Sequence, residues 1–286
     1  MAGLQLFGTD GIRGRVGEYP LLPDFVLRLG LSIGAVLRQA GARPSVIIGR
    51  DTRGSGQMLQ NALQAGLLAS GVTVIDAGVI TTPGVAYLAR KLDAAAGIVL
   101  SASHNPAGEN GIKLFDAQAR KLSEIIELDI ERLALDAARP ADQLMTRHYG
   151  RYVDGSGMRE LYLLNLVEEH RGLQLDRLIL VMDCANGAAS WIAPECFARL
   201  EAKVIAVHAS PTGLNINAAC GSEHVRRHPT DLGQLIRQYQ AHFGLAFDGD
   251  ADRVIFVDEE GALVDGDQML GILAGYLAAR GRLLAN

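Results

Sequence analysis

The chain is poor in cysteine, tryptophan and proline. It has three cysteines, one tryptophan and nine prolines among 286 residues. An odd number of cysteines, here Cys184, Cys196 and Cys220, without the spacing of a metal-ligand motif favours a reducing compartment. No uncharged stretch is long enough to span a bilayer, and the first residues do not have the pattern of a signal peptide. We therefore expect a cytoplasmic protein without a membrane partner.

An excess of positive charge is also missing. The chain has 27 lysines and arginines against 32 aspartates and glutamates, a net charge of −5. This balance argues against a nucleic-acid partner, although a few local cations can still bind a small anion. Hydrophobic residues make up 49% of the chain, which is enough for more than one core, and the length suggests roughly two domains.

The first half of the sequence alternates short apolar runs with helical patterns. Strands are expected at Ser45–Gly49, Val72–Ile75 and Gly97–Leu100, and helices at Gln57–Ser70 and Pro83–Lys91. Such an alternation predicts a mostly parallel sheet covered by helices. Ligands of these sheets lie beyond the carboxyl ends of the strands.

The second half repeats this plan. Strands are expected at Leu178–Met182, Val204–Val207, Phe243–Phe247 and Val254–Val257, and helices at Gly157–His170, Ala188–Leu200 and Leu232–Gln240. The fold class is therefore α/β: two consecutive, similar three-layer α/β/α domains with mixed, mostly parallel sheets, at residues 1–150 and 151–257. A turn at Glu259–Gly261 and a helix at Gly266–Ala279 would begin a short third domain over residues 258–286.

Three aspartates alternate directly after the strand expected at Phe243–Phe247. In an extended segment alternate side chains point the same way, so Asp248, Asp250 and Asp252 can converge on one cation. Three hard oxygen ligands suit Mg²⁺, which keeps further positions for phosphate or water. Without a cation these carboxylates would repel one another, so metal binding is favoured over a solvated acidic turn.

A calcium EF-hand loop is the sharpest alternative for this acidic cluster. Glu259 falls at the twelfth position counted from Asp248, where such a loop has its last ligand. The sixth position, however, holds Arg253 instead of glycine, and an apolar strand pattern follows it. The EF-hand is therefore disfavoured.

A second polar turn, Ser101-Ala102-Ser103-His104-Asn105-Pro106, follows the strand expected at Gly97–Leu100. A hydrolase triad is poorly supported here, because the adjacent Ser103 and His104 side chains project apart and the flanks lack the glycines of a nucleophile elbow. A serine that carries phosphate needs only an exposed hydroxyl, donors and a cation. Together with the aspartates, this serine supplies the parts of a phosphoryl-transfer site. The two motifs can meet only across a domain interface.

Basic residues accompany both motifs. Lys113, seven residues past Pro106, could bind phosphate or exchange a proton if its site lowers its pKa, and otherwise is a surface lysine. The segment 7–14, with three glycines and Arg13, could approach a phosphate closely, although its spacing is neither that of a Walker A loop nor that of a dinucleotide fingerprint. For Arg50-Asp51-Thr52-Arg53 a structural or inter-loop salt bridge is favoured over a catalytic role.

In this order, the motifs resemble the α-D-phosphohexomutase superfamily over essentially the whole chain. Phe-Gly-Thr-Asp-Gly-Ile-Arg-Gly at 7–14 and Ser-Ala-Ser-His-Asn-Pro at 101–106 are similar to its phosphoglucosamine mutase branch. The phosphomannomutase and phosphoglucomutase branches more often have Thr-Gly-Ser-His-Asn-Pro. Gly-Leu-Asn-Ile-Asn at 213–217, Cys-Gly-Ser at 220–222 and Asp-Gly-Asp-Gln at 265–268 also resemble the glucosamine branch.

This resemblance implies a mutase that interconverts glucosamine 6-phosphate and glucosamine 1-phosphate, toward UDP-N-acetylglucosamine and the cell wall. It implies that Ser103 is a phosphoserine and that glucosamine 1,6-bisphosphate is the intermediate and activator. One Mg²⁺ per chain would be held by Asp248, Asp250, Asp252 and a phosphate oxygen on Ser103. The remaining matched active-site positions are Arg13, His104, Lys113 and Arg253, with Lys113 as the general acid/base.

The family has four domains, so the resemblance also implies that these 286 residues are a fragment with little turnover of its own. The third-domain loop that binds sugar hydroxyls and the fourth-domain loop that binds the non-reacting phosphate are not found. The expected partner is a small sugar phosphate, and a homodimer is left open. The alternatives are a phosphomannomutase or phosphoglucomutase, a non-catalytic module that binds metal or sugar phosphate, and, less favoured, a metal-dependent phosphatase.

Overall fold

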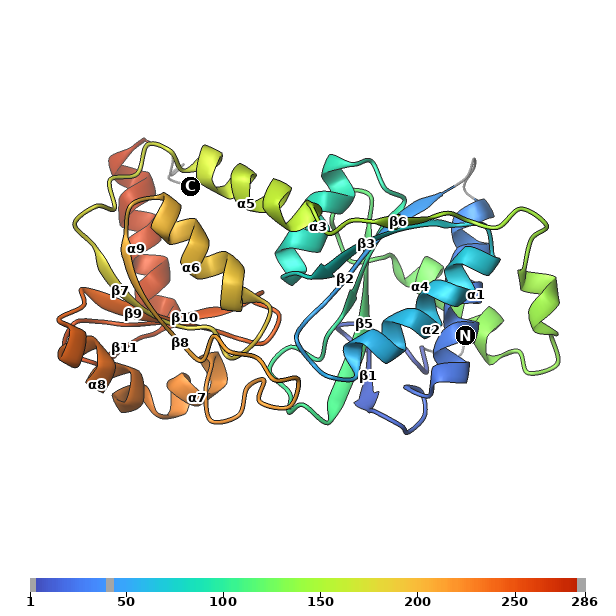
Figure 1. The fold of residues 1–286 in the computed structure, drawn as a ribbon, viewed down its shortest axis with the longest axis horizontal. Helices are drawn as coiled ribbons and strands as arrows, with labels where there is room; N and C mark the ends of the chain where they lie inside the picture. The colour runs from blue at the N-terminus through green and yellow to red at the C-terminus, as the bar shows by residue number, and fades with distance from the viewer. Residues whose placement is uncertain (1–3, 40–43, 282–286) are drawn as a thin grey trace.

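Two mixed β-sheets, each covered by helices, organise residues 4–39 and 44–281, which are the residues that the structure describes (Figure 1). In this computed structural model the first sheet has the strand order β1-β5-β4-β2-β3-β6 and the second β11-β10-β9-β7-β8. Three of five strand pairings in the first sheet and two of four in the second are parallel, and the antiparallel pairings lie together at one edge. The predicted pair of α/β units with mixed sheets is confirmed.

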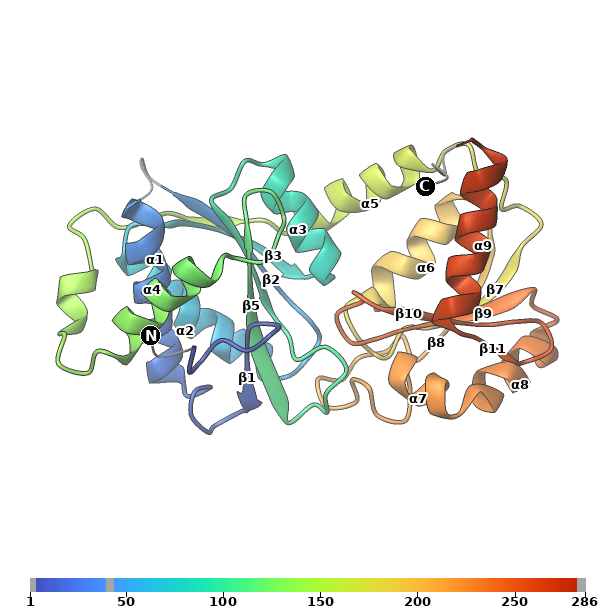
Figure 2. The same cartoon turned by 180° about the vertical axis from the view of Figure 1, so that it is seen from behind.

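The first unit buries its sheet on both faces. Its strands are β1 (Ile12–Arg15), β2 (Ser45–Arg50), β3 (Thr73–Val79), β4 (Ala96–Leu100), β5 (Glu109–Asp116) and β6 (Tyr152–Asp154). Its helices are α1 (Pro23–Gln39), α2 (Gly56–Ala69), α3 (Thr82–Lys91) and α4 (Glu124–Leu135), with the 3₁₀ turn η1 (Ala141–Leu144). Along β2, Val46 and Ile48 face the core under α1, α2 and α4, whereas Ile47 faces the core under α3. Figures 1 and 2 show α3 on the opposite side of the first sheet from α1, α2 and α4. This alternation explains the continuous apolar run of a strand buried on both sides.

The first sheet extends beyond residue 150, where the sequence suggested a boundary. β6 pairs in parallel with β3, with Tyr152 opposite Val74 and Asp154 opposite Asp76. Helix α5 (Met158–Glu169) follows, and it packs against α3 of the first unit and α6 of the second. Figure 1 shows α5 between the two units. The chain therefore passes from the first unit to the second through a helix that packs against both.

The second unit repeats the layered arrangement. Its strands are β7 (Ile179–Asp183), β8 (Lys203–Val207), β9 (Phe243–Phe247), β10 (Val254–Val257) and β11 (Leu263–Val264), and its helices are α6 (Ala189–Arg199), α7 (Ser222–Arg227), α8 (Pro229–Tyr239) and α9 (Gly266–Ala279). Leu180 and Met182 face the core under α6, and Val181 faces the core under α7 and α8. Both central strands, β7 and β9, end at the same edge of this sheet.

The segment that follows β10 adds one more strand to the second sheet. β11 pairs antiparallel with β10, so residues up to Val264 complete the second sheet. Asp265 and Gln268 then begin α9 with a capping box, in which each side chain accepts from the other residue's backbone N–H. No residue of α9 is buried. Among the described helices, none is both long enough and apolar enough to cross a bilayer.

Candidate active site

The two motif loops meet between the sheets. The turn from Ser101 to Pro106 follows β4, and the aspartate cluster follows β9. The Ser103 hydroxyl donates a hydrogen bond of 2.6 Å to Asp248 Oδ2, although 145 residues separate the two. Ser103 is 1% exposed, contrary to the exposed hydroxyl expected from the sequence, because loops of the second unit cover it, and Asp248 is fully buried. The structure thus brings the candidate phosphate carrier into direct contact with the acidic cluster.

The backbone of Ser103 has a left-handed conformation, with φ of 53°. A non-glycine residue adopts this conformation at a cost, so its neighbours have to stabilise it. The hydroxyl of Ser101 accepts from the Ser103 N–H at 2.8 Å and donates to Asp51 Oδ2 at 2.6 Å. The first serine of the turn therefore positions the second.

Arg53 stabilises the same turn through hydrogen bonds. Its Nε pairs with Asp51 Oδ2 at 2.9 Å, and neither side chain is exposed to solvent. Its guanidinium also donates to the backbone carbonyls of Ser103, Asn105, Pro106 and Glu109. Planar, forked donors make arginine suited to such a set of fixed acceptors. The structural role expected for the segment Arg50–Arg53 is thus found for Asp51 and Arg53, which stabilise the turn.

Loops of the second unit dock on the serine turn. Asn217 Nδ2 donates to the carbonyls of Ser103 and Asn105, at 2.9 and 3.0 Å. Gly249 packs so closely that a Cβ at this position would lie 2.6 Å from the Ser103 carbonyl oxygen. Further bonds between the units join Thr52 to Asn186, Gly54 to Gly213 and Thr82 to Asp250. The site is therefore assembled by contacts between the two units.

The aspartate cluster has the geometry and the chemistry of a cation site. One carboxylate oxygen of each of Asp248, Asp250 and Asp252 lies within 4.8 Å of the others, and the first two residues are fully buried. Asp250 Oδ1 is buried without a hydrogen-bond partner among the described residues. Burial, together with repulsion from Asp250, raises the pKa of Asp248 to about 7. A divalent cation would satisfy the free oxygen and relieve the repulsion, and hard oxygen ligands suit magnesium.

Lys113, on β5, lies among three carboxylates. Its Nζ is 2.8 Å from Asp250 Oδ2 and 3.1 Å from both Asp252 Oδ2 and Asp10 Oδ2. Burial alone would lower the pKa of Lys113, but Asp250, Asp252 and Asp10 outweigh burial and raise that pKa. In this arrangement the surrounding carboxylates therefore favour the charged ammonium.

Arg253 and His104 complete the contacts of the serine. The guanidinium of Arg253 donates to the Ser103 hydroxyl and to Asp248 Oδ2, the latter at 3.0 Å, and contacts His104 Nδ1. Burial, with the nearby charge of Arg253, lowers the pKa of His104, which favours a neutral imidazole. Arg13 pairs with Asp10, which in turn contacts Lys113, and the charge of Arg13 also contributes to the lowered pKa of His104.

Three residues of this site were not predicted as site residues, although Asp10 and Asn217 lie in motifs that were noted at 7–14 and 213–217. Asp10 lies inside the glycine-rich segment 7–14, but nothing in that pattern indicates its contact with Lys113. Thr82 donates to Asp250 Oδ2 at 2.6 Å from the start of α3, and Asn217 bonds the serine turn. These contacts join segments far apart in the chain, and single polar residues in turns carry no local signal for them.

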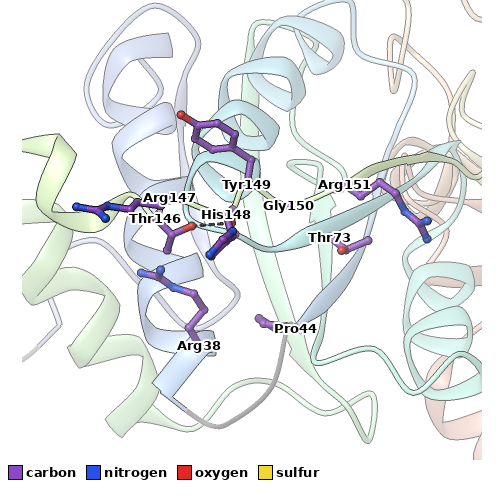
Figure 3. Close-up of a pocket in the computed structure, with 10 residues that line it drawn as sticks. Arg38, Pro44, Thr73, Thr146, Arg147, His148, Tyr149, Gly150 and Arg151 are labelled. Atoms are coloured by element: carbon purple, nitrogen blue, oxygen red, sulfur yellow. Dashed lines mark hydrogen bonds between the residues drawn. The ribbon is translucent and has the colours of Figure 1, made fainter.

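A cavity of about 320 Å³ borders the site. It is lined by residues that include His104, Pro106, Asn217, Glu223 and Arg227. A larger cavity, about 950 Å³, lies at the starts of β2 and β3, with Arg38, Arg147 and His148 among its lining residues (Figure 3). The larger cavity contains none of the predicted site residues, because ligand-bearing loops of this fold follow the strands and do not precede them.

Comparison with protein families assigns both units. Residues 4–139 match "Phosphoglucomutase/phosphomannomutase, alpha/beta/alpha domain I", and residues 160–261 match domain II of the same description. The chain therefore belongs to the phosphoglucomutase/phosphomannomutase family.

Individual proteins of this family are similar to the chain over nearly its whole length. The phosphoglucosamine mutase of Pseudomonas putida (strain W619) is 47% identical over 279 residues, which cover 98% of this chain and 61% of that protein. The chain thus spans less than two thirds of the length of this curated relative. A phosphoglucomutase/phosphomannomutase family protein from Burkholderia thailandensis superposes with a TM-score of 0.80 at 27% identity, over 96% of this chain and 59% of that one.

A more distant structure shares the fold. It is the N-acetylphosphoglucosamine mutase of Aspergillus fumigatus in complex with GlcNAc-6P and magnesium. Its TM-score is 0.51 at 15% identity, over 98% of this chain and 56% of that one.

Proposed function

We propose that this chain is the phosphoryl-transfer half of a phosphoglucosamine mutase, an intramolecular phosphotransferase that interconverts glucosamine 6-phosphate and glucosamine 1-phosphate. The observation that carries the proposal is the 2.6 Å contact between Ser103 and Asp248, made by strand-end loops of two different sheets. The 47% identity to a relative of that name supports the choice of sugar. The enzyme would act in the cytoplasm, on the route to UDP-N-acetylglucosamine and cell-wall precursors.

In this proposal Ser103 carries the phosphate. The bond from phosphorus to the Ser103 oxygen breaks as a bond to a sugar hydroxyl oxygen forms, and the hydroxyl proton passes to Ser103, giving glucosamine 1,6-bisphosphate and a free serine hydroxyl. The bisphosphate reorients, and its other phosphate returns to Ser103, so no phosphate is consumed. Arg253 donates to the Ser103 hydroxyl and contacts His104. Both side chains would hold the phosphoryl oxygens.

Asp248, Asp250 and Asp252 would hold one magnesium ion, together with a phosphate oxygen on Ser103. The unpartnered Asp250 Oδ1 and the magnesium in the Aspergillus fumigatus complex support this assignment. When bound, the ion offsets negative charge on the transferring phosphoryl group. Lys113 and Arg13 add positive charge beside the cluster, and the acid/base role of Lys113 stays a prediction.

Two other functions are kept as candidates. A phosphomannomutase or phosphoglucomutase is favoured by the family description and by the Burkholderia thailandensis structure. A non-catalytic module that binds metal or sugar phosphate is the second candidate, because the chain covers only 61% of the Pseudomonas putida relative.

The function is tested by measuring turnover of glucosamine, glucose and mannose phosphates by the complete gene product and by the 286-residue chain alone. We expect the complete product to prefer glucosamine phosphates. The chain alone should turn over far more slowly, because positioning of the remote part of the substrate supplies much of the rate. A preference for mannose or glucose phosphate would favour the first alternative. Near-normal turnover by the chain alone would contradict its assignment as half of the machinery.

Magnesium should stabilise the chain, because it binds the folded cluster and not the unfolded chain. At a concentration one hundred times the Kd, the free energy of unfolding should rise by about 2.7 kcal/mol. Thermal unfolding with and without MgCl₂ measures this effect. Asp250→Asn should abolish most of it, whereas Asp129→Asn, in an exposed i,i+3 ion pair with Arg132, should leave it unchanged. An equal magnesium response in Asp250→Asn would contradict the assignment.

A further inference from the structure

A second group of metal-ligand side chains lies in the second unit, apart from the three aspartates. Asp183 ends β7, His208 follows β8, and Cys220 precedes α7. One ligand atom of each lies within 4.8 Å of the others, and Asp183 Oδ2 is 3.1 Å from His208 Nδ1. Asp183 and Cys220 are buried, whereas the His208 side chain is 44% exposed. The three side chains are therefore close enough to share one ion, and one of them reaches solvent.

The backbone around the group orients its carboxylate. Asp183 Oδ1 accepts from the Ala185 N–H and Oδ2 from the Gly221 N–H, each at 2.8 Å. His208 has a φ of 46°, so its backbone is in the left-handed region that is uncommon for a residue with a side chain. Hydrogen bonds that fix a ligating group are a usual feature of metal sites. Strained backbone at such a position is an observation that suggests function.

Two cavities give access to the group. Asp183 and His208 line a cavity of about 180 Å³. Cys220 lines the cavity of about 320 Å³ that borders the serine turn. His224 lines both cavities, and its Nε2 is 2.8 Å from Asp231 Oδ2. An ion and a water ligand would thus be able to reach the group through either cavity.

The donor types distinguish this group from the aspartate cluster. The aspartates offer only hard oxygens, whereas this group offers one thiolate sulfur, one imidazole nitrogen and one carboxylate oxygen. Sulfur and nitrogen ligands select zinc-like cations, and three protein ligands with one water form a common zinc coordination. We propose that Asp183, His208 and Cys220 bind Zn²⁺ or a similar thiophilic divalent cation, separately from the magnesium site. On binding, the Cys220 thiol gives its proton to solvent.

The other explanation is purely structural. Asp183 would then serve only to fix the turns that contain Ala185 and Gly221, with His208 as its exposed partner and Cys220 as a buried thiol. The two explanations differ in one measurable respect. Only a metal site forms a bond between Cys220 sulfur and the ion.

Cobalt(II) is the probe, because a thiolate bound to Co²⁺ produces a near-ultraviolet charge-transfer band that oxygen ligands do not produce. Titration of the 286-residue chain with CoCl₂ under reducing conditions should give this band with one ion per chain, and ZnCl₂ should remove it. Co²⁺ at the three aspartates contributes no such band, so the two sites are distinguished in one spectrum.

Variants assign the ligands. Cys220→Ser should abolish the band, and the matched control Cys196→Ser should keep it. His208→Ala, at an exposed position that is not needed for the core, should weaken cobalt binding about tenfold or more. Far-ultraviolet circular dichroism checks that each variant is folded. The proposal is overturned if saturating cobalt gives no band, if the band survives in Cys220→Ser or vanishes in Cys196→Ser, or if His208→Ala binds with unchanged affinity.

Discussion

Replacing Ser103 with alanine should reduce mutase turnover of the complete gene product by roughly 10⁴-fold or more, since removal of a covalent nucleophile eliminates the route itself. Alanine keeps the Cβ of serine and removes only the hydroxyl that bonds Asp248 and Arg253, so the fold should persist. The coupled mutase assay gives the rate. Intact-mass measurement should show that one phosphoryl group per chain is present in the wild type and absent in the variant.

Ser101 offers the matched control in the same turn. Its hydroxyl bonds Asp51 and the Ser103 backbone but has no contact with Asp248. Ser101→Ala should therefore keep the phosphoryl group on the chain and lose at most about 10²-fold in rate, through misplacement of Ser103. Retention of the phosphoryl mass in Ser103→Ala, or its loss in Ser101→Ala alone, would show that Ser103 is not the carrier.

Replacing Arg53 with alanine should give the largest loss of stability. The change leaves Asp51 as a buried carboxylate without its ion-pair partner and removes the guanidinium bonds to four backbone carbonyls, two of which still accept from Asn217. Breaking one partner of a buried ion pair typically costs about 3–5 kcal/mol. Urea unfolding, followed by circular dichroism, measures the change in the free energy of unfolding.

Arg120→Ala serves as the comparison, because Arg120 forms an exposed ion pair with Asp116 at 3.2 Å. Its loss should cost about 0.5 kcal/mol or less. Arg53→Lys keeps the charge but not the planar fork, so it should remain clearly destabilised. Similar stabilities of Arg53→Ala and Arg120→Ala would refute the role of Arg53 as the support of the serine turn.

Local patterns predicted four central strands, of which β4 and β9 directly precede the two motifs. β2, β4, β7 and β9 are short apolar runs that end in polar turns, and each lies within one or two residues of its expected bounds. Buried parallel strands need apolar side chains on both faces, so such strands have a strong sequence signal. The turns that follow contain Ser103 and the aspartates, and their place at strand ends could therefore be predicted.

Helix α1 and strand β5 had weak local signals and were not predicted, whereas α2 was predicted within one residue of its bounds. Helix α1 contains Gly30, and α2 contains Gly66; the two helices approach so closely that a Cβ on Gly66 would lie 2.1 Å from the Leu27 carbonyl oxygen. Glycine lowers helix propensity, so packing between the helices compensates for what the local sequence disfavours. On β5, a Cβ at Gly111 would lie 2.6 Å from the Ser101 carbonyl oxygen and 2.7 Å from that of Ile12, so close packing requires glycine there. Pairing across the sheet, not propensity, determines this strand.

By itself, the sequence determined the two-unit α/β plan, the serine turn and the three alternating aspartates, because these depend on the order and spacing of neighbouring residues. Only the tertiary structure decided that Ser103 touches Asp248, that Arg53 supports the turn, and that Lys113 lies charged among carboxylates. Arg53 and the serine turn both belong to the first unit. The contacts of Ser103 with Asp248 and of Lys113 with the aspartates join segments from separate sheets. They arise because the second unit docks against the first at the ends of β4 and β9, and no local pattern encodes that docking.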